Sequence, residues 1–293
     1  MPEMTGRRAI VTGGNSGIGY ETALGLAAAG ASVTLGCRDE ERGADAARRI
    51  VRRIPSADVS VGLLDLSDQS SVEAFAGRWQ TPLDVLINNA GVMAPPRRAV
   101  TVDGFELQMG TNHLGHFALT GRLLPALLAG TDPRVVTVAS IATRRAELNL
   151  DDLQSVVGYR PHTAYANSKL ANLMFALELQ RRAGTGLAST AAHPGLAVTG
   201  LISDREGVGA NPLGRWAGPI LNRITSQSAA AGAQPTLFAA TRAAGGSYTG
   251  PRRLLETRGA PAPADISAAA ADPASAAELW ELSTELTGVA FGL

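Results

Sequence analysis

A tyrosine and a lysine stand four residues apart in the stretch HTAYANSKLANLMF, residues 162–175. The leucines that follow have helical spacing, so Tyr165 and Lys169 are expected on one face of a helix, one turn apart. A free phenol titrates near pH ~10 and is a poor base at neutral pH, but a nearby ammonium favours the phenolate. An isolated pair of this kind is usually a plain surface contact, so it is a candidate acid–base group only if other residues join it.

A second group of residues lies near the N-terminus, in VTGGNSGIG. Gly13, Gly17 and Gly19 stand where a strand is expected to turn into a helix. Glycines at such a turn let the backbone approach a pyrophosphate, whose charge is met by the helix N-terminus. A bare glycine pattern is unspecific, but its place in the first strand–helix unit favours a dinucleotide.

The elements that must position these groups alternate along the chain. Short apolar, β-rich runs occur at 8–14, 31–37, 59–66, 83–91, 134–140 and 187–195. Helix-like stretches lie at 17–29, 39–53, 68–79, 103–128, 163–183 and near 229–240. Strands that are apolar throughout indicate a parallel sheet covered on both faces. The alternation therefore predicts an α/β fold with one doubly wound parallel sheet of the Rossmann type and helices on both faces.

The C-terminal part is predicted to be a loop followed by a helix. The Ala- and Pro-rich stretch 259–275 is expected to be the loop, and DPASAAELWELSTELTG closes the chain as the helix. Asp272 suits the N-cap, Pro273 the first turn and Gly288 the C-terminal stop. No shift in composition marks a boundary, so residues 1–293 are interpreted as a single domain.

The composition argues against several classes of protein. The 293 residues carry zero formal net charge, which gives no electrostatic footprint for nucleic acid or an anionic membrane. Cys37 is the only cysteine, so no disulfide can form within the chain and Cys-based metal clusters are excluded. We find no signal peptide and no run of ~18 uninterrupted apolar residues. A soluble, cytoplasmic protein is expected.

Several motifs, in the right order over nearly the whole chain, resemble the short-chain dehydrogenase/reductase family. They are TGGNSGIG, LDL at 64–66, NNAG at 88–91, Asn112, Ser140, Tyr165-x-x-x-Lys169 and HPG at 193–195. The finer match resembles the retinol-dehydrogenase-like branch, which includes the WW-domain-containing oxidoreductases. It rests on GCRDEERG, NHLGHFALT, SKLANLMFALELQRR and LWELSTELTG.

The resemblance implies a catalytic set of four residues. Tyr165 would be the acid/base, and Lys169 would lower its pKa and hold the ribose hydroxyls of a nicotinamide cofactor. Ser140 would hydrogen-bond the substrate oxygen, and Asn112 would hold a water against the lysine through a kink in its helix. Without the resemblance, Ser140 is a turn former and Asn112 a plain polar helix residue.

The resemblance also implies cofactor contacts in the glycine-rich loop, beside the adenine, along the adenosine ribose and pyrophosphate, and on the nicotinamide side. The residues are Gly13, Asn15, Ser16, Gly17, Ile18, Gly19, Asp65, Leu66, Asn89, Ala90, Gly91, Tyr165, Lys169, Pro194, Gly195 and Thr199.

The end of the second strand bears on the choice between NADP and NAD. Where NAD-preferring relatives place an Asp, this chain has Cys37, and the guanidinium of Arg38 beside it suits a 2′-phosphate. Asp39 is the alternative, as an NAD-type ribose ligand, but it opens a helix at DEERG and is interpreted as its N-cap. NADP is therefore predicted, with Arg38 as a ligand, and NAD is less favoured.

Together these residues predict an NADP(H)-dependent oxidoreductase that interconverts a hydrophobic alcohol and its aldehyde or ketone. The hydrophobic substrate is inferred from a predicted lid at about 196–228, which is rich in apolar residues such as Trp216 and interrupted by glycines. The alternatives are a non-catalytic NADP(H)-binding or sensor protein, and an NAD-dependent dehydrogenase of the same fold.

Two further expectations concern metals and partners. His113 and His116 have a possible metal-ligand spacing, but no acidic or Cys partners accompany them and the family uses no catalytic metal, so no metal site is predicted. The family often pairs through helices that include the tyrosine helix, which makes a homodimer or homotetramer an expectation from the resemblance.

Overall fold

The computed structural model describes residues 1–196 and 227–293. The described strands form one sheet in the order β3-β2-β1-β4-β5-β6-β7-β8. Strands β1 to β7 run parallel, and β8 is antiparallel to β7. The strands are β1 (Arg8–Thr12), β2 (Ser32–Cys37), β3 (Val59–Leu63), β4 (Val85–Asn88), β5 (Arg134–Val138), β6 (Ala188–Ala192), β7 (Tyr248–Arg253) and β8 (Arg258–Pro263).

Helices follow the parallel strands, as the alternation predicts. They are α1 (Gly17–Ala28), α2 (Glu40–Arg53), α3 (Gln69–Gly77), α4 (Leu107–Met109), α5 (Gly115–Leu128), α6 (Pro161–Ala183), α9 (Ala229–Thr241), α10 (Ala268–Ala271) and α11 (Pro273–Thr287). A π-helical turn, η1 (Gly110–Leu114), joins α4 to α5, and a 3₁₀ turn, η2 (Ile141–Arg145), follows β5.

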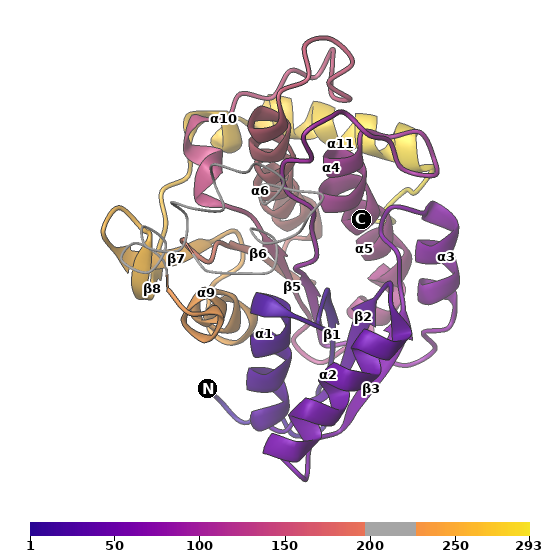
Figure 1. The fold of residues 1–293 in the computed structure, drawn as a ribbon, viewed down its shortest axis with the longest axis vertical. Helices are drawn as coiled ribbons and strands as arrows, with labels where there is room; N and C mark the ends of the chain where they lie inside the picture. Colours follow the sequence, from indigo (N-terminus) through magenta and orange to yellow (C-terminus); the bar gives the residue numbers. More distant parts are fainter. Residues whose placement is uncertain (197–226) are drawn as a thin grey trace.

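Both faces of the sheet are covered by helices (Figure 1). Ala9 and Val11 of β1 pack into a cluster with residues of α1, α2 and α9. Ile10, between them, packs into the opposite cluster with residues of α3, α5 and α6. Alternate side chains of a strand point to opposite faces, so a strand buried on both faces must be apolar throughout. The predicted doubly wound α/β fold is therefore confirmed.

Several helix ends are set by single residues that the sequence identifies. The Asp39 side chain accepts a hydrogen bond from the Arg42 N–H at the start of α2. Asp272 caps α11 in the same way, Pro273 is its first residue, and Gly288 ends it in the left-handed conformation. The predicted N-caps and the C-terminal stop are confirmed.

The expectation of a loop over 259–275 is wrong. This stretch contains most of β8 and all of α10, and β7 before it was not predicted at all. Prolines hid β8, because they are tolerated in a strand only at a sheet edge or a bulge, and β8 is the edge strand. The β7–β8 pairing also contains a register shift between Pro251 and Arg253.

The order in which strands are added to the sheet reverses between β1 and β4. From β1 the chain adds β2 and β3 on one side, and it then returns to add β4 and β5 on the other side of β1. In open α/β sheets, ligands bind outside the carboxyl ends of the strands at such a switch point. Most of the predicted lid at 196–228, with Thr199 and Trp216, lies outside the described residues. Among the helices in the described ranges, none is long and apolar enough to span a membrane.

Candidate active site

The predicted site residues gather at the carboxyl ends of the parallel strands. The glycine-rich loop follows β1, Arg38 follows β2, Asp65 and Leu66 follow β3, Asn89 to Gly91 follow β4, Ser140 follows β5, and Pro194 and Gly195 follow β6. Asn112 lies in η1, and Tyr165 and Lys169 lie on α6. Six separate loops thus reach one edge of the sheet.

The glycine-rich loop is locked to the loop after β4. Gly13 has a φ of 64°, in the left-handed region that favours glycine. A Cβ on Gly19 would collide with the Gly13 carbonyl oxygen and would lie 2.5 Å from Asn89 Nδ2. Asn89 Nδ2 in turn donates to the Thr12 carbonyl oxygen at 2.7 Å. Only glycine fits at position 19, because the two loops meet there.

The start of α1 is suited to bind an anion. Its N-cap Ser16 makes no side-chain capping bond, and no acidic residue lies in the first turn. The first N–H groups of a helix have no partner within the helix and attract negative charge. With the close glycine packing, these donors fit the pyrophosphate of a dinucleotide.

At the end of β2, Cys37 is buried and Arg38 is exposed. Burial raises the pKa of the Cys37 thiol, so it stays protonated and cannot act as the carboxylate would. Asp39 is engaged with the Arg42 N–H at 3.0 Å. Among Cys37, Arg38 and Asp39, Arg38 therefore offers an exposed cation, whereas the Asp39 carboxylate already caps a helix.

Tyr165 is half-buried on α6, and Lys169 one turn later is 4% exposed. Lys169 Nζ donates to the Val138 carbonyl oxygen, at the end of β5, at 2.9 Å. Burial lowers the pKa of Lys169 to about 8. Burial raises the pKa of Tyr165, and hydrogen bonding with Ser140 works in the opposite direction.

This result differs from the expectation that Lys169 lowers the pKa of the phenol. Burial is the larger cause of the shift of the Tyr165 pKa and acts upward, while the Lys169 ammonium donates to the Val138 carbonyl oxygen. The Tyr165 hydroxyl therefore stays protonated at neutral pH.

Asn112 is fully buried in η1. Its Oδ1 accepts from the Val92 N–H at 2.8 Å, and its Nδ2 donates to the Ser168 hydroxyl at 2.9 Å. A Cβ on Gly91 would lie 2.9 Å from Asn112 Oδ1 and 3.5 Å from Lys169 Nζ. The structure therefore brings Asn112, Gly91 and Lys169 together. The predicted helix kink takes the form of the π-helical turn, a feature that occurs often at functional sites.

Sequence reasoning missed two groups that hold this edge together. Tyr248 of β7 donates from its hydroxyl to the Ser140 carbonyl oxygen at 3.2 Å. His193 Nε2 lies 2.9 Å from a carboxylate oxygen of Glu256, which also pairs with Arg144 of η2. The HPG motif pointed to His193, but no sequence signal indicated its partners, because they lie on the unpredicted β7–β8 hairpin and on η2.

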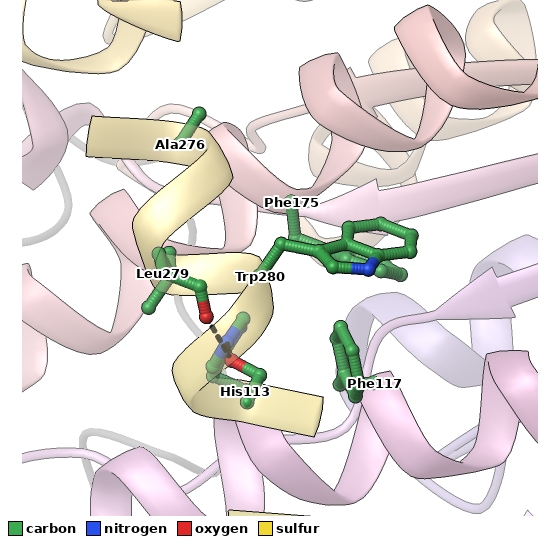
Figure 2. Close-up of a pocket in the computed structure, with 7 residues that line it drawn as sticks. His113, Phe117, Phe175, Ala276, Leu279 and Trp280 are labelled. Atoms are coloured by element: carbon green, nitrogen blue, oxygen red, sulfur yellow. Dashed lines mark hydrogen bonds between the residues drawn. The ribbon is translucent and has the colours of Figure 1, made fainter. Parts of the chain in front are cut away.

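The two histidines with metal-like spacing have other partners. His113 Nε2 contacts the Ser283 hydroxyl of α11 at 2.9 Å, and His116 Nδ1 contacts the Asn112 carbonyl oxygen at 2.8 Å. His113 also lines, with Phe117, Phe175 and Trp280, a pocket that is too small to hold a water molecule (Figure 2). Within residues 1–196 and 227–293, no cluster of three or more His, Cys, Asp or Glu side chains could hold a metal ion.

Comparison with known proteins gives a family match. The model of the short chain dehydrogenase family matches residues 7–206. Retinol dehydrogenase 12 of Mus musculus is 38% identical over 291 residues, which cover 98% of this chain and 88% of that protein.

Solved structures agree with this match. A protein of Mycobacterium paratuberculosis, described only as uncharacterised, is 43% identical, with a TM-score of 0.82 and coverage of 100% of this chain and 97% of that one. A protein of Beutenbergia cavernae, described as an NAD(P)-dependent gluconate 5-dehydrogenase with NADP bound at low occupancy, is 27% identical, with a TM-score of 0.61. The match covers 83% of this chain and 91% of that protein.

Proposed function

Because this chain belongs to the short-chain dehydrogenase/reductase family and resembles its retinol-dehydrogenase-like branch, we propose that it interconverts a hydrophobic alcohol and its aldehyde or ketone, with NADP(H). The family itself is one of oxidoreductases. The observation that carries the proposal is that Ser140, Tyr165 and Lys169 lie together at the carboxyl end of the parallel strands, beside the glycine-rich loop.

In this proposal, Tyr165 exchanges the proton and Ser140 holds the substrate oxygen. A nicotinamide cofactor, when bound, supplies or accepts the hydride. Tyr165, kept protonated by burial, gives its proton to the carbonyl oxygen during reduction and takes it back during oxidation. The Ser140 hydroxyl donates to the same oxygen and fixes its distance from the phenol. Lys169 supplies positive charge beside the ribose hydroxyls.

The choice of NADP rests on Arg38. A guanidinium binds a phosphate through paired, charge-assisted hydrogen bonds, whereas a ribose hydroxyl pair prefers a carboxylate. Asp39, the carboxylate closest in sequence, is used as a helix N-cap. The NADP bound in the Beutenbergia cavernae protein supports this choice, and an NAD-dependent enzyme is the alternative.

The hydrophobic substrate rests on the composition of residues 196–228 and on the relative named for retinol, an apolar alcohol. We propose that residues 1–293 are one domain and that 196–228 cover the substrate. A cytoplasmic location and a homodimer or homotetramer stay predictions.

The test is NADPH oxidation by wild type and by Tyr165→Phe against a panel of hydrophobic aldehydes, ketones and quinones. Tyr165→Phe removes the proton donor and little volume, so kcat should fall by at least ~10²-fold while NADPH still binds. Ala166→Gly, on the same turn of α6, is a control for disturbance of the helix. Near-normal turnover in Tyr165→Phe would refute the mechanism. NADPH binding without turnover of any substrate would favour the sensor alternative.

A further inference from the structure

His116 has a defined protonation state, and the structure shows why. The side chain is 1% exposed and lies on α5, four residues after Asn112. Its Nδ1 lies 2.8 Å from the Asn112 carbonyl oxygen, which can only accept a hydrogen bond, so Nδ1 carries a hydrogen. Burial lowers the pKa of His116 to about 3, so the ring is neutral near pH 7. Its Nε2 is then unprotonated and needs a donor.

Thr12, the last residue of β1, is that donor. Its hydroxyl lies 2.8 Å from His116 Nε2 and accepts hydrogen bonds from the Asn89 and Ala90 N–H groups at 2.8 and 2.9 Å. The hydroxyl has one hydrogen. The Ile87 carbonyl oxygen lies farther away, at 3.2 Å, so the hydrogen goes to Nε2. Every polar atom of the His116 ring and of the Thr12 side chain is thereby used.

These bonds form one unbroken chain between the two halves of the site. The chain starts at the Asn89 and Ala90 N–H groups at the switch point and passes through Thr12 and His116. It ends at the Asn112 carbonyl oxygen in the π-helical turn. From Asn112, the side-chain amide continues to the Ser168 hydroxyl, next to Lys169. His116 lies in the middle of this chain of hydrogen bonds. Its rigid ring donates from Nδ1 to Asn112 and accepts at Nε2 from Thr12.

We propose that His116 is a positioning residue that holds the Asn112 carbonyl, and with it the π-helical turn, in register with the cofactor-binding loop after β4. It acts through Asn112 on the placement of Ser168 and Lys169. This inference rests on the proposed function, because the effect is to be read in the rate of hydride transfer.

His113 provides a natural contrast on the same helical segment. Its Nε2 lies 2.9 Å from the Ser283 hydroxyl, whose own hydrogen goes to the Leu279 carbonyl oxygen at 2.7 Å. The hydroxyl must therefore accept from His113, which places that hydrogen on Nε2. The two buried histidines, three residues apart, are assigned opposite tautomers.

The kinetic test compares two replacements of His116. In His116→Asn the amide N–H falls near the position of Nδ1–H and can keep the bond to the Asn112 carbonyl, so kcat should stay within ~3-fold of wild type. In His116→Gln the amide falls near Nε2 and the Asn112 carbonyl loses this side-chain donor. We expect kcat to fall at least ~10-fold with the KM for NADPH little changed, as for a buried acceptor left unpaired. His113→Gln, which keeps a donor toward Ser283, is the matched control and should leave kcat unchanged. Equal kcat in the two His116 variants, at any level, would overturn the proposal.

A second measurement needs no turnover. In the cofactor-free wild type with ¹⁵N-labelled histidine, long-range ¹H–¹⁵N correlation spectra distinguish a protonated from an unprotonated ring nitrogen. The neutral ring protonated at Nδ1 should be that of His116, identified as the one of the four histidine signals that remains in each of His113→Gln, His162→Gln and His193→Gln. A His116 ring protonated at Nε2, or at both nitrogens near pH 7, would overturn the proposal even if the His116 variants fail to fold. A wild type without oxidoreductase activity would refute the proposed function and leave this spectrum unaffected.

Discussion

At the scale of single residues, the unusual group in the site is a buried ammonium. Lys169 is 4% exposed, and its contact of 2.9 Å is with a neutral carbonyl, that of Val138. A buried cation without a carboxylate partner loses its proton more easily, which is the physical cause of its pKa of about 8. Lys169 is therefore close to losing, at physiological pH, the positive charge that the proposed mechanism needs beside the ribose.

This gives a prediction about pH. Lys169 is cationic below about pH 8 and neutral above it, so kcat/KM for carbonyl reduction should fall as the pH rises through about 8. Lys169→Arg keeps a charge that is not lost in this range, since guanidinium titrates above pH ~12. Its rate should be lower because of geometry, but the alkaline fall should be absent. A pH–rate profile measures both enzymes, and the same alkaline limb in the arginine variant would assign the fall to another group.

A second prediction concerns the cofactor. Cys37→Asp combined with Arg38→Leu supplies a ribose acceptor and removes the phosphate ligand. The ratio of kcat/KM for NADP to that for NAD should fall by at least ~10²-fold, since charge-assisted hydrogen bonds contribute ~1.5–3 kcal/mol each. The control is Asp39→Asn, which keeps a capping side chain on α2 and should keep the NADP preference. A wild type that prefers NAD, with this preference lost in Asp39→Asn, would make Asp39 the ribose ligand.

At the scale of elements, the β7–β8 hairpin braces the end of β6. The Leu196 N–H donates to the Thr257 carbonyl oxygen at 3.0 Å, and the Gln227 N–H donates to the Leu196 carbonyl oxygen at 2.7 Å. Gln227 Nε2 also donates to the Pro194 carbonyl oxygen at 2.7 Å. The described residues on the two sides of 197–226 thus meet beside the predicted nicotinamide contact Pro194.

The prediction at this scale concerns the substrate. If residues 196–228 cover a hydrophobic substrate, kcat/KM should rise with substrate chain length or ring count, by up to ~0.8 kcal/mol per buried methylene. Trp216→Ala should flatten this trend and leave NADPH affinity unchanged. A homologous series of aldehydes assayed with both enzymes measures it. A strong preference for small polar or anionic substrates would refute the hydrophobic assignment.

At the scale of the whole molecule, the C-terminal helix α11 completes an aromatic cluster. Trp280 of α11 stacks on Phe175 of α6 at a centroid distance of 5.7 Å and meets Phe117 of α5 edge-on at 5.2 Å (Figure 2). Phe291, near the end of the chain, lies 4.5 Å from Trp280. Since α11 packs on α5 and α6, a homodimer through these helices would have to form around α11 or displace it.

The corresponding prediction is one of stability. Trp280 is 4% exposed, so Trp280→Ala should lower the free energy of unfolding by ~3–5 kcal/mol, as for other large aromatic truncations in a core. Glu281→Ala, its neighbour on α11, removes an exposed ion pair with Arg182 and should cost less than ~1 kcal/mol. Urea unfolding followed by circular dichroism compares them, and a cost below ~1 kcal/mol for Trp280→Ala would mean that α11 contributes little to the fold.

The sequence by itself determined the parts that depend on local signals. Strands β1 to β6 were predictable because each is an apolar run between helices, and the ends of α2 and α11 were predictable because Asp39, Asp272 and Gly288 act within one helical turn. The edge strand β8 was not, because its prolines mask a strand that forms only by pairing with β7.

For the candidate site, the sequence determined which residues reach the sheet edge, because the motifs stand at strand ends. Only the tertiary structure decided how they are used. Lys169 turns to Val138, Asn112 binds Val92 and Ser168, and Thr12 fixes the tautomer of His116. Each of these contacts joins atoms from segments far apart in the chain, and their energies depend on burial and on which donors remain unpaired. No spacing in the sequence encodes those quantities, since they arise only when the elements pack.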